Sequence, residues 1–507
     1  MGNGGEKTLS AQGWASASAI LLGVTGASKG LGLFRELLLA SYLGASGQVD
    51  AYAVAYAVPL FLGGGIGYAF STTIIPGYHH KVVECGQEAG IRYLSTMCLS
   101  SLVWSLVLLI PVWVMPQSLV RFAAPSLPEE TMGLAVELMG WLALYVLIQN
   151  SVYVLSAVFH SFNHFRLPAA IDLVFNITVI GFLVALAAKW EIRALVMGNL
   201  TGIVACFLLL TIVLLRGAVP SRLLAFRLQE LVRPLVICLP VVAYYLASQS
   251  PSILANYFAS GLGEGSIAAF SYAKTILAAV VTLITLSVAR AAFPTFAALA
   301  SGGRTEEFRQ LVVGFAKLIL FLFLPLSTLA WVYREPVLRL LYQHGVFDDA
   351  ALVLTATAFG FLALGLTFAA WEPVGTRALY AAGDARGPLL ATIGSLSSVL
   401  PLLIVLTPAL GLGGVALSLS LALAVDSGLQ VFSLGRRLES PIWRDLASFF
   451  AKCAACALSA GTLFLLLPVN GFPAVLVGTA LYIGLYGLLI WSLVQPVKSI
   501  VSLGTAR

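Results

Sequence analysis

Charged residues are scarce in this sequence. Only 10% of its 507 residues are Asp, Glu, Lys or Arg, whereas 60% are hydrophobic and the mean hydropathy is +0.97. A soluble globular protein carries about 25% charged residues, so this chain cannot cover a surface that faces water. The deficit excludes a soluble enzyme, a disordered protein and a nucleic-acid-binding module. It predicts an all-α, polytopic membrane protein whose main partner is the lipid bilayer.

Motifs that serve catalysis are missing as well. Neither G-x-x-x-x-G-K-[ST] nor H-E-x-x-H occurs, and the 5 histidines fall at predicted helix edges. No predicted loop exceeds about twenty residues, which leaves no room for the acid-bearing loop of a membrane transferase or the nucleotide domain of a pump. We therefore expect no enzyme activity, no metal site and no cofactor. Transport would draw on a Na⁺ or H⁺ gradient, the membrane potential or the substrate's own gradient.

Cysteine is rare, with 6 residues that mostly lie inside apolar runs. Cys453 and Cys456 form a C-x-x-C on a predicted helix, but a metal or redox site would need a second ligand pair. This pattern predicts packing thiols. The N-terminal MGNGGEKTLSAQG has no basic stretch leading into a short apolar core, so we expect no cleaved signal peptide.

Long apolar runs, by contrast, are abundant. A helix that crosses the bilayer takes about 20 mostly apolar residues, and this rule predicts fourteen of them, at 14–43, 51–78, 95–119, 132–157, 167–188, 194–215, 229–259, 266–297, 309–332, 350–381, 387–407, 411–434, 446–468 and 471–495. With a cytoplasmic N-terminus, eighteen Lys and Arg residues lie on the inner side and five on the outer side. The positive-inside rule then predicts that both termini are cytoplasmic.

Landmarks recur along the chain at a nearly constant offset. Arg166 and Pro168 lie at the start of the fifth predicted helix as Arg386 and Pro388 lie at the start of the eleventh, and a Tyr-Ala pair at 56–57 recurs at 272–273. Such repetition is typical of transporters built from duplicated bundles. We expect an N-terminal six-helix lobe at 14–216, a basic cytoplasmic linker at 217–228, a C-terminal six-helix lobe at 229–437 and two additional helices within 438–507.

Five cations remain at membrane depth: Lys29, Arg35, Lys274, Arg290 and Arg377. Three of them are candidates for one site, Lys29 and Arg35 in the first helix and Lys274 in the corresponding bundle of the second half. A charge at that depth costs about 3 kcal/mol on insertion scales, so such residues usually face a wet cavity. One interpretation is a cationic cavity that binds a phosphate or pyrophosphate. The alternative is local pairing, as between Arg35 and Glu36.

Other polar features suggest a gate and an ion site. Asp50 opens the second helix, where it can cap the N-terminus or contact a ligand, and Gly63, Gly64 and Gly65 favour either a hinge or close packing. The acids Glu372, Asp384 and Asp426 are candidates for Na⁺ or H⁺ coupling, with simple packing pairs as the alternative.

One family matches these landmarks. Ser28 to Glu36, followed by Tyr42-Leu43-Gly44 and Asp50-Ala51-Tyr52, resembles the S-R-x-L-G-x-x-R-[DE] … F-G … [TD]-D-A-[FY] opening of the MurJ (MviN) lipid II flippases. Further matches lie at 159–168, 341–347, 377–388 and 411–417, so the resemblance runs from about residue 15 to 437.

The resemblance implies a fold and a function. The fold is that of the multidrug/oligosaccharidyl-lipid/polysaccharide (MOP) exporter superfamily, with two six-helix lobes in a V and two C-terminal helices whose groove takes a polyprenyl tail. The function is movement of undecaprenyl-pyrophosphate-linked peptidoglycan precursor, lipid II, from the inner to the outer leaflet of the bacterial cytoplasmic membrane by alternating access, for cell wall biosynthesis. The family's cavity arginines map to Lys29, Arg35 and Lys274. We expect a monomer.

The departures from the family pattern keep alternatives open. Two of these cations are lysines, and a further arginine position of the family, in the second helix, falls within Gly63 to Gly65. A lysine offers a point charge in place of a bidentate fork, so the pyrophosphate site is reduced. Export of another polyprenyl-linked glycan, an exopolysaccharide or O-antigen repeat unit, is the first alternative, and a cation-coupled multidrug exporter is the second.

Overall fold

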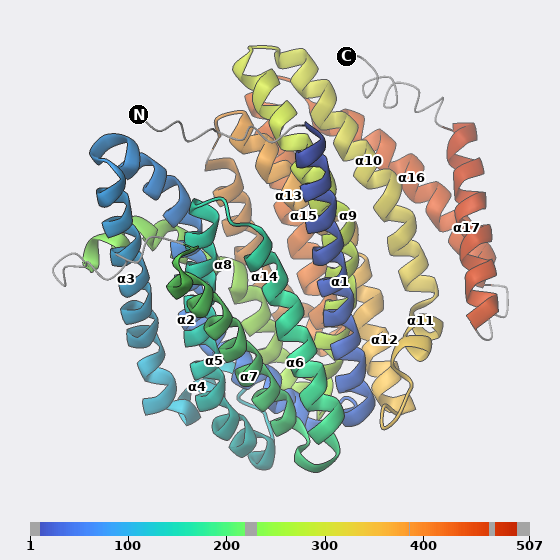
Figure 1. The fold of residues 1–507 in the computed structure, drawn as a ribbon. Coiled ribbons are helices and arrows are strands. Elements are labelled where there is room, and N and C mark those ends of the chain that lie inside the picture. The colour runs from blue at the N-terminus through green and yellow to red at the C-terminus, as the bar shows by residue number, and fades with distance from the viewer. Residues whose placement is uncertain (1–10, 219–230, 385, 466–471, 494–507) are drawn as a thin grey trace. The chain divides into compact units, whose positions relative to one another are not determined.

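The computed structural model describes residues 11–218, 231–384, 386–465 and 472–493, and in these residues the chain is helical without a strand (Figure 1). The prediction of an all-α polytopic protein is thus confirmed. The helices are α1 (Ala11–Leu43), α2 (Gly47–Cys85), α3 (Gln87–Val114), α4 (Pro116–Ala123), α5 (Glu129–Ser161), α6 (Arg166–Trp190), α7 (Ile192–Val213), η1 (Leu214–Ala218), α8 (Val232–Ala259), η3 (Ser260–Leu262), α9 (Ser266–Ser301), α10 (Thr305–Val332), α11 (Arg334–Tyr342), α12 (Asp349–Ala363), α13 (Leu366–Ala381), α14 (Arg386–Leu410), α15 (Leu412–Arg437), α16 (Ile442–Leu465) and α17 (Phe472–Leu493).

The long helices follow the predicted apolar runs. Each of the fourteen predicted ranges overlaps one long helix or, at 350–381, the pair α12 and α13. The range 95–119 is too long, because α3 ends at Val114 and the range runs into α4, and the range 194–215 runs from α7 into η1. By length and composition, 10 helices in the described part of the chain could cross a membrane, or up to 11 if the bent pair is one span. A total of fourteen spans stays a prediction. The short helices α4 and α11 were not anticipated as separate helices, because 8 and 9 residues are too few for an apolar-run rule to detect.

The predicted single helix at 350–381 is wrong in one respect, because it is broken between α12 and α13, which are bent by 45°. Ser420 of α15 explains where the break falls. Its hydroxyl donates to the carbonyls of Phe361 at 2.8 Å and Leu362 at 3.3 Å, which satisfies acceptors at the helix end. A Cβ on Gly365 would lie 2.9 Å from the Cα of Ser420, so only glycine permits this approach.

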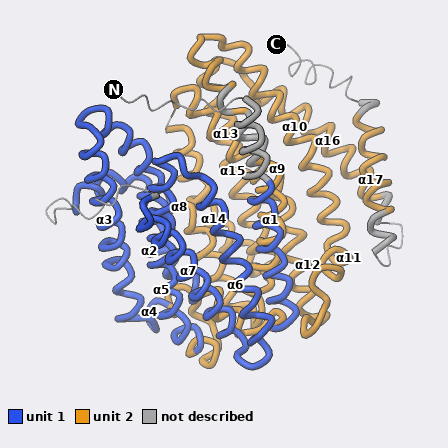
Figure 2. Tube along the Cα trace, viewed as in Figure 1, with its two compact units in different colours: residues 1–42, 55–119, 134–246 blue, residues 43–54, 120–133, 247–507 orange. Residues whose placement is uncertain are grey.

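The chain forms two compact units (Figure 2). Unit 1 comprises residues 1–42, 55–119 and 134–246, and unit 2 comprises residues 43–54, 120–133 and 247–507. The predicted lobe boundaries stay a prediction, and residues 219–228 of the predicted linker lie outside the described residues.

A buried asparagine joins three helices within unit 1. The amide nitrogen Nδ2 of Asn150 in α5 donates to the carbonyl of Gly63 in α2 at 2.9 Å and to the hydroxyl of Ser105 in α3 at 2.8 Å. A polar side chain at membrane depth needs such partners because lipid provides none. Asn150 therefore fixes the middle of α2 against α3 and α5.

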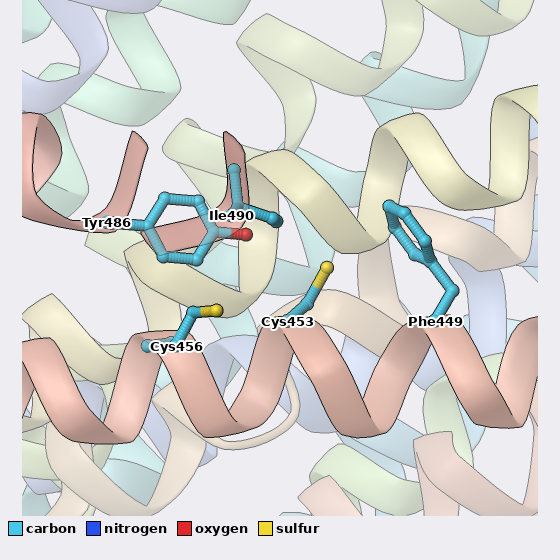
Figure 3. Packing of buried hydrophobic residues seen from close by; sticks show 6 residues of the cluster. Phe449, Cys453, Cys456, Tyr486 and Ile490 are labelled. Atoms are coloured by element: carbon cyan, nitrogen blue, oxygen red, sulfur yellow. The ribbon is translucent and has the colours of Figure 1, made fainter. Parts of the chain in front are cut away.

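Unit 2 is built around α9 and α15. Helix α9 packs against α12 and α13, whereas α15 packs against α12, α13 and α14. The C-terminal helices α16 and α17 join at a buried cluster that includes Phe449, Cys453 and Cys456 of α16 and Tyr486 of α17 (Figure 3). Both thiols are free and buried, and the Tyr486 hydroxyl donates to the carbonyl of Phe321 in α10 at 3.1 Å. The C-x-x-C thus contributes to helix packing.

Candidate functional site

Arg35 of α1 forms the local ion pair that its sequence neighbourhood suggests. Its Nη2 donates to Glu36 Oε1 at 2.7 Å, and both side chains are partly exposed. The guanidinium also lies over the ring of Phe175 in α6, 5.9 Å from the ring centroid, a distance at which cation–π attraction acts. Arg35 is therefore held in a fixed place in unit 1, with its charge partly balanced.

Lys29, one and two-thirds helical turns before Arg35 on α1, is exposed and lies within electrostatic range of Asp172 in α6. Asp172 is exposed as well. An acid and a base that are both exposed at membrane depth must meet water, because lipid cannot solvate them. A water-filled space beside Lys29 and Asp172 stays a prediction.

Lys274 of α9 has no acidic partner in the described part of the chain. Its Nζ donates to the hydroxyl of Ser252 in α8 at 2.6 Å, and the side chain is exposed. A neutral hydroxyl orients the ammonium group without cancelling its charge. Among the three predicted cations, Lys274 therefore carries the largest uncompensated charge for an anionic ligand.

Asp50 lies buried in the first turn of α2, within the part of α2 that belongs to unit 2. Its carboxylate caps α9. Its Oδ2 accepts from the backbone amide of Gly265 at 2.7 Å, and its Oδ1 accepts from that of Ala268 at 2.7 Å. A carboxylate at the start of α9 satisfies free amides and interacts favourably with the helix dipole. Gly265 has φ of +81°, and a Cβ there would overlap the carbonyl of Ala45, so this close approach requires glycine.

The glycine run at 63–65 lies inside a continuous α2. A Cβ on Gly63 would lie 2.8 Å from the Leu109 side chain, and one on Gly64 would lie 2.7 Å from the hydroxyl of Tyr245 in α8. These contacts belong to close helix packing, with no unwound segment at these positions. A hinge role for the three glycines stays a prediction.

Glu372 of α13 and Asp426 of α15, two of the predicted coupling acids, lie within electrostatic range of each other in unit 2. Two polar residues connect them. Gln430 Nε2 donates to Asp426 Oδ2 at 2.7 Å and lies 3.4 Å from the hydroxyl of Thr376, which in turn lies 3.4 Å from Glu372 Oε1. Asp426 is only 5% exposed and Gln430 1%.

Two atoms beside these acids are buried without a hydrogen-bond partner, Gln430 Oε1 and Trp371 Nε1. A Cβ on Gly375 would contact both, so they meet at the same point between α13 and α15. The nearby Arg377 donates to the carbonyl of Pro373 at 2.9 Å, and no salt bridge to Glu372 or Asp426 occurs in the described residues. The arrangement can accept a proton or a small cation.

Asp384, the third predicted coupling acid, accepts from the backbone amides of Arg386 at 3.0 Å and Gly387 at 2.8 Å. These are the bonds of a cap on α14. They give Asp384 a structural role, and its role in coupling stays a prediction.

Sequence reasoning missed the residues that support these acids and bases. Thr376 follows Glu372 by one helical turn, as Gln430 follows Asp426, so a search for polar residues four positions after each membrane acid would have found both. Asp172 stands out in the sequence as an acid at membrane depth, but its proximity to Lys29, like that of Ser252 to Lys274, depends on how helices pack.

Comparison with known proteins identifies the family. Residues 39–484 match the family model for lipid II flippase MurJ. A lipid II flippase MurJ from Burkholderia cenocepacia is 25% identical over 452 residues, 86% of each chain, and a probable lipid II flippase MurJ from Thermotoga maritima is 24% identical, covering 77% of this chain and 79% of the relative.

Solved structures show the same fold. A lipid II flippase MurJ in an inward closed conformation aligns with a TM-score of 0.81 at 22% identity, covering 94% of this chain and 99% of that one. An inward-facing multidrug resistance transporter of the MATE family, in the MOP superfamily, aligns with a TM-score of 0.64 at 15% identity, covering 81% and 94%. With the family model spanning most of its length, the chain belongs to the MurJ lipid II flippase family.

Proposed function

We propose that this protein moves lipid II from the inner to the outer leaflet of the bacterial cytoplasmic membrane by alternating access. Membership of the MurJ family over residues 39–484 is the observation that carries this proposal. The exposed ammonium of Lys274, which donates to a neutral hydroxyl and has no acidic partner among the described residues, supports it chemically, because a diphosphate is the part of lipid II that needs a cation at membrane depth.

The orientation and assembly of the protein are part of the same proposal. We infer that both termini are cytoplasmic, since basic residues concentrate in the segments that this orientation places inside. The protein acts as a monomer and performs no covalent chemistry, so it transports its substrate unchanged.

Ion coupling is assigned to Glu372 and Asp426. Asp426 is buried and Glu372 is half-buried, and two neighbouring carboxylates with so little access to water are costly unless a proton or cation neutralises them. The buried oxygen of Gln430 adds a further ligand for a cation or an acceptor for a protonated acid. Binding of Na⁺ or H⁺ here, between α13 and α15, would change the packing of unit 2 and so couple the gradient of that ion to transport.

A depletion experiment tests the proposed cargo. Cells that lose the protein should accumulate lipid II in the cytoplasmic leaflet. The measurement is the fraction of lipid II that is protected from an externally added degrading enzyme, and this fraction should rise. Loss of a surface polysaccharide with normal wall synthesis would instead identify another polyprenyl-linked glycan, as the replacement of family arginines by lysines allows. Altered drug resistance as the only effect would identify a multidrug exporter.

A further inference from the structure

Unit 1 exposes two tyrosines within its long helices, and neither belongs to the cation sites described above. Tyr68 of α2 is 41% exposed and Tyr153 of α5 is 44% exposed. Both lie well inside helices long enough to cross a membrane. A phenol at such depth needs a polar neighbour or water for its hydroxyl, because lipid offers no hydrogen bond.

The exposed tyrosines are connected to a third, Tyr245 of α8. The rings of Tyr68 and Tyr245 lie 5.7 Å apart between centroids and are tilted by 35°, a separation typical of aromatic pairs. Tyr153 lies within electrostatic range of Tyr245 and of Asp172. Aromatic rings from α2, α5 and α8 therefore gather on one part of unit 1.

The glycine run of α2 explains why Tyr245 stands where it does. A Cβ on Gly64 would lie 2.7 Å from the Tyr245 hydroxyl, and one on Gly65 would lie 3.0 Å from its Cδ1. The missing side chains leave space for the ring between α2 and α8. Gly64 and Gly65 thus act as positioning residues for this tyrosine.

Asp172 indicates that this part of unit 1 meets water. It is exposed and lies near the exposed ammonium of Lys29, and a charged pair at membrane depth faces a wet space. Tyr153 is itself exposed and lies within electrostatic range of Asp172, which places it in the same part of unit 1. Aromatic faces beside a carboxylate are what a sugar ring requires: its C–H face packs on the rings, and its hydroxyl and amide groups bond to polar side chains.

We propose that Tyr68, Tyr153 and Tyr245, called here the tyrosine surface, bind the saccharide of a lipid-linked glycan and so select a glycosylated carrier lipid over the bare carrier. This inference rests on the proposed function, in that it takes the cargo to be a lipid-linked saccharide. It assigns the sugar to unit 1 and requires no particular glycan.

Binding of two ligands by purified protein in nanodiscs tests the tyrosine surface. The ligands are lipid II, which carries a saccharide, and undecaprenyl pyrophosphate, which carries none. Tyr153→Ala and Tyr68→Ala should each weaken lipid II binding about tenfold, the scale of a lost aromatic contact and its buried area. Binding of undecaprenyl pyrophosphate should stay within about twofold. Tyr153→Phe, which keeps the ring, should retain most of the lipid II affinity.

The control is Tyr257→Ala, which removes a tyrosine that is 43% exposed in unit 2 and should leave both affinities unchanged. Equal losses for both ligands in the Tyr153 and Tyr68 variants, or no loss for either, would overturn the inference. A third ligand separates it from the proposed function. If the wild type prefers another lipid-linked glycan to lipid II and Tyr153→Ala removes that preference, the proposed cargo is wrong and the tyrosine surface stands.

Discussion

The carboxylate oxygen Oδ1 of Asp50 accepts a hydrogen bond from the backbone nitrogen of Ala268, which lies 218 positions further along the chain, at 2.7 Å. The bond lies within unit 2, to which residues 43–54 belong, although the chain on either side of this segment belongs to unit 1. The cap on α9 therefore holds the segment through which α1 leads into α2. In alternating access, such a segment is well suited to be bound in one state and released in another.

We expect Asp50→Ala to lower the free energy of unfolding by about 1 to 2 kcal/mol, the usual cost of a lost helix cap. It should also reduce flipping by more than this loss explains, because one conformational state loses its cap. Asp348→Ala is the matched control, since Asp348 caps α12 through the amide of Ala351 at 2.8 Å. Thermal unfolding and flipping in proteoliposomes measure both effects. Equal flipping in the two variants at equal stability would contradict a gating role.

A second prediction concerns the break between α12 and α13. Ser420→Ala removes the hydroxyl that serves the carbonyls of Phe361 and Leu362, and we expect a loss of about 1 to 3 kcal/mol in unfolding free energy. Ser418→Ala removes a hydroxyl that bonds only within its own helix, to Gly414, and should cost less. Thermal unfolding in detergent compares the two, and a larger loss for Ser418→Ala would show that the break does not depend on Ser420.

The fold was largely predictable from sequence because the bilayer restricts what an apolar run can form. Lipid offers no hydrogen bonds to backbone N–H and C=O groups, so a run of about 20 apolar residues forms a helix in which these groups bond to one another. The helices α2, α5 and α9 were predicted in this way. The break at Gly365 was not predictable, since it lies in an uninterrupted apolar stretch and depends on a serine in α15.

The candidate site was predictable only in its charged members. Lys29, Arg35 and Lys274 stand out because charges are rare at membrane depth. Their partners depend on tertiary packing, and the pairing of Arg35 with Glu36 alone could be anticipated from their adjacency. The tyrosine surface escaped notice because single tyrosines on α2, α5 and α8 carry no spacing signal.

Lys274 gives a third prediction. Lys274→Ala should weaken binding of undecaprenyl pyrophosphate about tenfold or more, since a charge-assisted bond to phosphate is lost. Lys274→Arg should retain affinity, because it keeps the charge and restores the residue type that the family resemblance implies. Lys189→Ala, which removes an exposed lysine at the end of α6, is the control. If it weakens binding as much as Lys274→Ala does, non-specific attraction rather than a defined site holds the ligand.

Glu372 and Asp426 give the last prediction. Glu372→Gln and Asp426→Asn keep the shape of each side chain but remove its capacity to bind a proton or to attract a cation. Flipping driven by an imposed pH or Na⁺ gradient in proteoliposomes should therefore lose its dependence on that gradient, while binding of undecaprenyl pyrophosphate persists. Asp384→Asn is the matched control, because Asp384 caps α14 and its amide variant keeps one acceptor oxygen. Should Asp384→Asn abolish the gradient dependence and the other two variants preserve it, coupling would lie at the end of α14 and not between α13 and α15.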